Sequence, residues 1–152
     1  MRSHWWGIIF LFLALVSFFV ARQWSSLFPD AVTLQSEANC DIAAGPCRSS
    51  LPDGGSLQLS ITPVPIPLMQ PLQVEVKVQN SQLTPLQLDI TGLNMEMGLN
   101  RTRLEPGAPG HWSGETILPI CSQRRMHWQA ALLLGDGTRQ FRMAYPFYTL
   151  RP

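Results

Sequence analysis

Apolar and polar residues alternate with a period of two through most of the C-terminal two thirds of the chain. The clearest example alternates four apolar with three polar residues from Leu72 to Val78. Successive side chains of a strand point to opposite faces, so this pattern predicts strands that are buried on one face. The same reasoning predicts about seven strands, at residues 57–61, 72–78, 86–90, 93–99, 112–118, 126–134 and 141–145.

Glycine and proline separate these segments, for example at Gly54-Gly55, Pro106-Gly107 and 135–137. No amphipathic helical pattern interrupts the series. We therefore expect an all-β domain over residues 56–152, folded as an immunoglobulin-like two-sheet sandwich. The prolines of the run 62–71 cannot donate to a sheet ladder, so this run is predicted to be an edge or a rigid extended connection.

The N-terminal segment has a different pattern, with no charged residue from Trp5 to Ala21. Seventeen residues of helix cover roughly 25 Å, the short end of what a bilayer core requires. Trp5, Trp6 and Trp24 are suited to the lipid-water interface on either side. A cleaved signal peptide is the alternative, but the residues around Ala21 match a cleavage site poorly, so residues 1–28 are interpreted as an uncleaved anchor.

Composition narrows the functional classes. The chain has 152 residues, a formal net charge of +1 and only 14% charged residues, and its lysines and arginines are dispersed. A nucleic-acid-binding protein would show a basic patch, so DNA and RNA are not expected partners. The sequence also lacks a phosphate-binding loop, a metalloprotease motif and a nucleophile elbow, and we expect no enzymatic activity.

Three cysteines bear on the compartment. Cys40 and Cys47 flank a Gly-Pro turn that could bring their sulfurs together, which predicts a disulfide within a linker at residues 29–55. A disulfide implies an extracytoplasmic domain and therefore a cytoplasmic N-terminus, which the flanking Arg2 and Arg22 favour only weakly. A zinc site and two free thiols are the alternatives, and Cys121 is left without a partner.

The candidate metal ligands are soft. Met95 and Met97 lie two residues apart, on one face of the strand predicted there, and thioethers select Cu(I). Cys121, Met126 and His127 are further candidate ligands, as is His111. The alternative for both methionines is ordinary core packing beside Leu93 and Leu99. Alternation also predicts that Met126 points inward and His127 outward.

The order of segments from Leu86 to Thr149 resembles that of the bacterial FixH and YtkA-like proteins. In that order a Met-rich strand is followed by a Pro-Gly turn, an outgoing strand and a Met-x-Trp strand. The resemblance implies a small membrane-anchored sandwich associated with copper handling or with assembly of haem-copper oxidases. This chain differs in having no histidine beside Met95 and Met97 and in carrying Cys121.

These observations lead to two hypotheses. The first is a membrane-anchored accessory protein on the periplasmic side of a bacterial inner membrane, handling Cu(I) with copper-delivery proteins or a respiratory oxidase as partners. The second is a metal-free structural or interaction module that binds a membrane protein. Thiol-disulfide exchange at Cys40 and Cys47 is a weaker alternative, because their spacing is far from Cys-x-x-Cys.

Overall fold

The structure is a computed structural model and describes residues 3–27, 31–34, 40–98 and 100–151. The chain forms two compact units, residues 1–30 and 31–152, which are described separately. The second unit is called the domain below.

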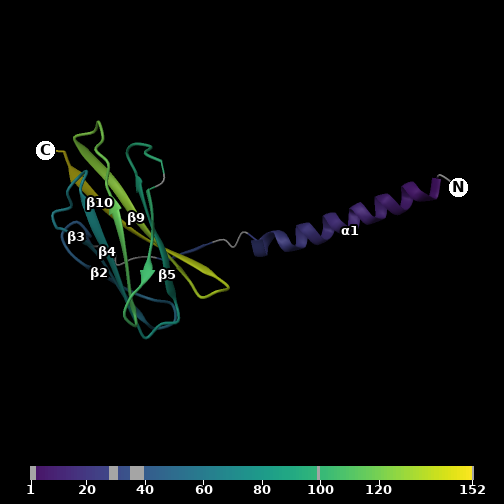
Figure 1. Cartoon of the computed structure of the whole chain (residues 1–152), viewed down its shortest axis with the longest axis horizontal. Helices are drawn as coiled ribbons and strands as arrows, with labels where there is room; N and C mark the ends of the chain where they lie inside the picture. Colours follow the sequence, from purple (N-terminus) through teal and green to yellow (C-terminus); the bar gives the residue numbers. More distant parts are fainter. Residues whose placement is uncertain (1–2, 28–30, 35–39, 99, 152) are drawn as a thin grey trace. The chain divides into compact units, whose positions relative to one another are not determined.

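The first unit contains one helix, α1 (Ser3–Leu27), in which the stretch from Trp5 to Arg22 is long and apolar enough to cross a membrane (Figure 1). Every side chain in this stretch is exposed, including Phe10 and Phe12. A helix that is apolar on all sides and buries none of its faces is typical of a segment whose solvent is lipid.

The domain contains two five-stranded sheets. The first has the order β1-β10-β9-β5-β6, and the second the order β2-β3-β4-β8-β7. The first comprises β1 (Val32–Leu34), β10 (Gln140–Leu150), β9 (Arg125–Gly135), β5 (Thr84–Gly92) and β6 (Asn100–Arg103). The second comprises β2 (Cys47–Ser50), β3 (Ser56–Thr62), β4 (Pro71–Gln79), β8 (His111–Ile117) and β7 (Glu105–Pro106). Strand β1 runs parallel to β10, and the other pairings are antiparallel.

The inward residues of both sheets form one hydrophobic core. Strand β4 shows why the alternation predicted this, because Leu72, Val74, Val76 and Val78 are buried while Gln73 and Glu75 are exposed. Burying one such aliphatic side chain stabilises the fold by about 1.5 to 3 kcal/mol. In the part of the domain that the structure describes, buried side-chain nitrogen and oxygen atoms have hydrogen-bond partners. For example, the Trp128 indole donates to the hydroxyl of Thr149 over 2.9 Å. The expectation of an all-β, two-sheet domain is confirmed.

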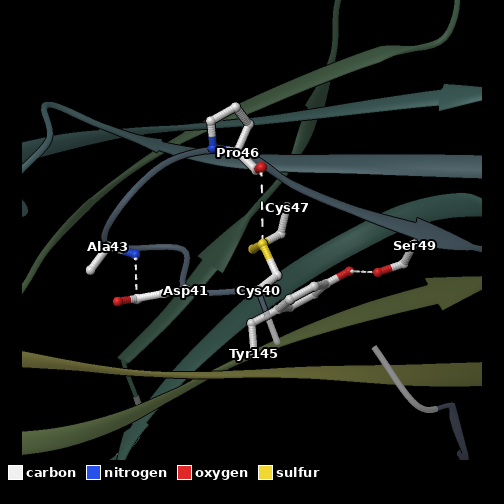
Figure 2. The surroundings of a disulfide bond; sticks show 7 residues. All are labelled: Cys40, Asp41, Ala43, Pro46, Cys47, Ser49 and Tyr145. Carbon is white, nitrogen blue, oxygen red and sulfur yellow. Dashed lines mark hydrogen bonds between the residues drawn. A yellow bond between two sulfur atoms is a disulfide. The ribbon is translucent and has the colours of Figure 1, made fainter. Parts of the chain in front are cut away.

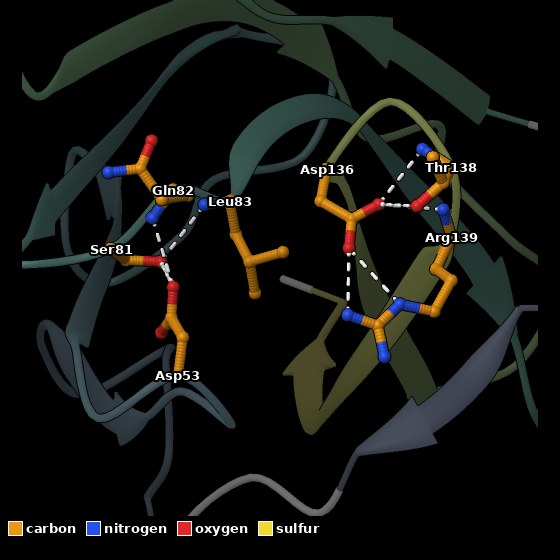
Figure 3. Close-up of polar contacts among 7 residues, drawn as sticks. All are labelled: Asp53, Ser81, Gln82, Leu83, Asp136, Thr138 and Arg139. Carbon is orange, nitrogen blue, oxygen red and sulfur yellow. Dashed lines mark hydrogen bonds and ion pairs between the residues drawn. The ribbon is translucent and has the colours of Figure 1, made fainter.

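Carboxylates hold two of the turns (Figure 3). Asp136 accepts hydrogen bonds from the backbone amides of Thr138 and Arg139, and its second oxygen pairs with the Arg139 guanidinium at 3.0 Å. Asp53 accepts from the Ser81 hydroxyl at 2.6 Å and from the Gln82 amide at 2.9 Å. The turn after β2 is thereby joined to the connection between β4 and β5.

Six of the seven predicted strands are present, and the one predicted at residues 93–99 is not. Residues 93–98 form a loop between β5 and β6, and Leu99 lies outside the described residues. The physical reason is the side chain of Asn94, whose amide nitrogen donates to the Arg125 carbonyl and whose oxygen accepts from the His127 amide. These bonds turn the chain across the start of β9, and Gly98 adopts a left-handed conformation (φ +58°) before β6 begins.

Four short strands were not predicted: β1, β2, β6 and β7. The first two lie within residues 29–55, which the sequence interpretation treated as a linker. In the structure β1 extends one sheet and β2 extends the other, with Cys47 and Ser49 pointing inward. The domain therefore begins at Ala31. The proline-rich run connects β3 to β4, as expected for a segment without ladder donors.

Candidate functional site

The β5–β6 loop is fastened to the first residues of β9. The Leu93 amide donates to the His127 carbonyl over 2.7 Å, which adds to the two bonds made by Asn94. Residues more than thirty positions apart in the chain are therefore held side by side at one end of the sandwich. Four of the six candidate metal ligands belong to these two segments: Met95, Met97, Met126 and His127.

Gly92, the last residue of β5, is the point around which three methionines gather. A side chain at this position would collide with the Met126 methyl group and with the Met95 carbonyl, and would touch the Met97 side chain at 3.5 Å. Met126 is buried, and Met95 and Met97 are partly buried against the core. We call Met95, Met97 and Met126 the methionine cluster.

The sulfur of Met95 faces the segment between β8 and β9. The Ser122 hydroxyl donates to it over 3.6 Å, which places the residue after Cys121 against the methionine cluster. The Cys121 side chain is buried, and its sulfur lies 3.8 Å from the carbonyl of Pro119. Burial raises the pKa of this thiol, which favours the neutral form over the thiolate that binds metals best.

The two candidate histidines, His111 and His127, do not join the cluster. His127 points outward from β9, and its ring lies 6.2 Å, between centroids, from the ring of Tyr148. Met126 points inward, so both predictions from alternation are confirmed. His111 is exposed at the first residue of β8, whereas Cys121 lies four residues beyond Ile117, the last residue of that strand. Within the described part of the chain, no group of three His, Cys, Asp or Glu side chains could hold a metal ion.

The predicted disulfide is confirmed. Cys40 and Cys47 are bonded, with their Cα atoms 5.7 Å apart, and the short loop between them is folded on itself (Figure 2). Asp41 holds this loop by accepting from the Ala43 amide at 3.0 Å. Cys47 is fully buried, so the bond attaches the loop directly to the core.

An open groove of about 700 Å³ was not predicted from the sequence. Residues 65–70 of the β3–β4 connection line it together with residues 148–151 at the end of β10. Ile120, next to Cys121, and the disulfide loop residues Asp41 and Ala43 complete the lining. The only hint of this groove in the sequence is the run of alternating prolines, because such a run forms a stiff segment that can line one side of a groove. The other side depends on the tertiary fold.

Comparison with protein families, curated proteins and solved structures finds no match to this chain. The resemblance to FixH and YtkA-like proteins therefore stays a prediction.

Proposed function

We propose that this chain is a single-pass protein of a bacterial inner membrane, with α1 as an uncleaved anchor and the domain in the periplasm. The uncharged and exposed stretch of α1 from Trp5 to Ala21 supports the anchor. The Cys40–Cys47 bond supports an oxidising compartment for the domain, since structural disulfides persist outside the cytoplasm. The N-terminus is then cytoplasmic.

The domain's work, in this proposal, is to hold Cu(I) at the methionine cluster. The observation that carries it is the meeting of the Met126 and Met97 side chains and the Met95 backbone at Gly92, where the β5–β6 loop lies against β9. Neutral thioethers are soft ligands that suit Cu(I). A site without a thiolate would hold the ion loosely enough to pass it on. Cys121, whose thiol is buried and whose neighbour Ser122 contacts Met95, is a further soft ligand in this proposal.

The role that fits such a site is that of an accessory protein rather than an enzyme. Its partners would be copper-delivery proteins or a respiratory oxidase under assembly, as the resemblance to FixH and YtkA-like proteins implies. The strand order also supports an immunoglobulin-like sandwich. If β3, β4 and β8 are equated with strands A, B and E, then β10-β9-β5-β6 follows the order G-F-C-C′ of that fold.

The test is Cu(I) stoichiometry of the full-length protein, measured anaerobically in detergent by native mass spectrometry. The key variant is Met95→Leu/Met97→Leu/Met126→Leu, because leucine keeps the apolar volume and removes the sulfur. Met143→Leu is the matched control, since Met143 is fully buried on β10 and is not one of the three cluster methionines.

Loss of one bound Cu(I) in the triple variant, with retention in Met143→Leu, is the expected result. Equal binding by the wild type and the triple variant would place the metal elsewhere. No binding by either would support the competing hypothesis of a metal-free module that engages a membrane protein.

A further inference from the structure

Large apolar side chains are exposed beside the groove. Met69, Ile120 and Leu150 are 62%, 54% and 69% exposed, and all three line the groove together with Tyr148. The Met69 amide donates to the Leu118 carbonyl, which fixes the β3–β4 connection against the end of β8. We call Met69, Ile120, Tyr148 and Leu150 the apolar rim. The surface of a soluble protein seldom exposes so many apolar side chains together unless another molecule binds there.

Three arginines border the apolar rim. Arg125 is the partner of Leu150 across β9 and β10, and its guanidinium lies 4.1 Å from the centre of the Tyr148 ring. The Arg151 amide donates to the carbonyl of Arg124 over 2.9 Å, so these two residues are adjacent as well. Within the described residues, the ion pairs are Arg101–Asp89 and Arg139–Asp136, which leaves these three arginines outside any ion pair.

The surroundings of the arginines are therefore positive. Of the charged residues that line the groove, Arg151 is basic and Asp41 is acidic, and Arg124 and Arg125 add two positive charges beside the apolar rim. Positive charge beside exposed aliphatic and aromatic groups is complementary to a surface that is negatively charged above an apolar layer. That is the arrangement of an anionic phospholipid bilayer.

We propose that the apolar rim and Arg124, Arg125 and Arg151 dock the domain onto the surface of an anionic membrane. The arginines meet lipid phosphates, and Ile120, Leu150 and Met69 enter the interfacial layer. The bilayer is the partner that this chain itself supplies, because α1 tethers the domain to one. The inference therefore rests on the anchor in the proposed function and is independent of copper.

The experiment uses the full chain in nanodiscs, without copper. One set contains phosphatidylcholine alone, and the other contains phosphatidylcholine mixed with phosphatidylglycerol. Hydrogen exchange of residues 118–124 and 148–151 is followed by mass spectrometry. Each arginine near an anionic surface strengthens binding about fivefold. We expect these amides to exchange at least about fivefold more slowly in the anionic nanodiscs, and high salt to remove the difference.

The variant Arg124→Gln/Arg125→Gln/Arg151→Gln is expected to lose the lipid-dependent slowing. Its control, Arg48→Gln/Arg103→Gln/Arg142→Gln, removes the same charge from positions that do not border the rim and should retain the slowing. All six arginines are at least partly exposed, so neither variant should disturb the core, and circular dichroism checks this.

Four results would overturn the inference. Equal exchange in both nanodiscs, with the protein inserted, contradicts rim docking and leaves the anchor intact. Equal loss of slowing in both arginine variants indicates general charge attraction without a defined surface. Slowing that requires other membrane proteins, and not phosphatidylglycerol, identifies a protein partner instead. A chain that neither nanodisc retains contradicts the anchor, and the docking inference with it.

Discussion

The hydroxyl of Ser122 donates a hydrogen bond to the sulfur of Met95 over 3.6 Å and so joins residues 27 positions apart in the chain. A thioether sulfur is a weak acceptor, and the same lone pairs would serve a metal. The contact therefore connects the β8–β9 segment to the methionine cluster and also competes with any ion bound there.

Removing this hydroxyl should strengthen Cu(I) binding. In the wild type, the Met95 sulfur must give up its hydrogen bond from Ser122 in order to bind copper, and in Ser122→Ala it need not. Such a bond is worth about 1 kcal/mol or less, so its removal should raise the affinity for Cu(I) by up to about fivefold. Competition with a chromogenic Cu(I) chelator measures the change. Ser60→Ala, which removes a hydroxyl that bonds the Glu75 carbonyl on β4, is the control and should leave the affinity unchanged. A decrease in affinity in Ser122→Ala would contradict the competition.

Gly92→Ala should destabilise the domain. The added methyl group would collide with the Met126 methyl and the Met95 carbonyl, and the backbone atom cannot move aside cheaply. Overpacking of this kind costs about 1 to 3 kcal/mol, measured as a lower midpoint of urea denaturation. The control is Gly45→Ala, whose added methyl would meet open space. Equal midpoints for the two variants would show that the methionine cluster is not packed against Gly92.

Loss of the disulfide should lower the free energy of unfolding by about 2 to 3 kcal/mol, because the closed loop is short. The variant Cys40→Ala/Cys47→Ala avoids placing a hydroxyl at the fully buried position 47. Chemical denaturation with and without reductant provides the measurement. The wild type should lose stability when reduced and the variant should not respond; a response of the variant would point to chemistry at Cys121.

Acid should weaken the turn held by Asp136. Hydrogen bonds from the Arg139 backbone, and then from Thr138, hold the pKa of Asp136 well below its ordinary value of 3.8. Because the pKa is lower in the folded state, the carboxylate contributes stability above pH 3.8, and this contribution is lost as the pH falls below that value. Asp136→Asn should be less stable than the wild type at neutral pH.

The difference between Asp136→Asn and the wild type should shrink as the pH is lowered from about 7 toward about 2, because the Asp136 carboxyl of the unfolded wild-type chain takes up a proton below pH 3.8. Urea denaturation at a series of pH values measures both proteins. A difference that stays constant over this range would show that the charge on Asp136 is not the stabilising property.

Several features could be predicted from the sequence alone. Burial of one sheet face imposes a period of two, so alternation predicted the long strands β3, β4, β5, β8, β9 and β10. It also predicted that Met126 points inward and His127 outward. The apolar run from Trp5 to Ala21 predicted a helix of spanning length because no other element can satisfy its backbone in lipid. The eight-residue segment from Cys40 to Cys47 predicted its own disulfide, since the constraint is local.

The tertiary structure decided the remainder. Strands of two to four residues such as β1, β2, β6 and β7 carry too few side chains to show a period, and they exist because a neighbouring strand offers hydrogen bonds. The segment after Gly92 has the apolar pattern of a strand, but Asn94 pairs with the backbone of β9 and makes it a loop. That long-range pairing also brings Met97 and Met126 together at Gly92. The register of β9 against β10, in turn, places Tyr148 and Leu150 beside Arg125, and a backbone bond joins Arg151 to Arg124. Sequence spacing could not reveal these contacts, because they depend on the register between segments that are distant in the chain.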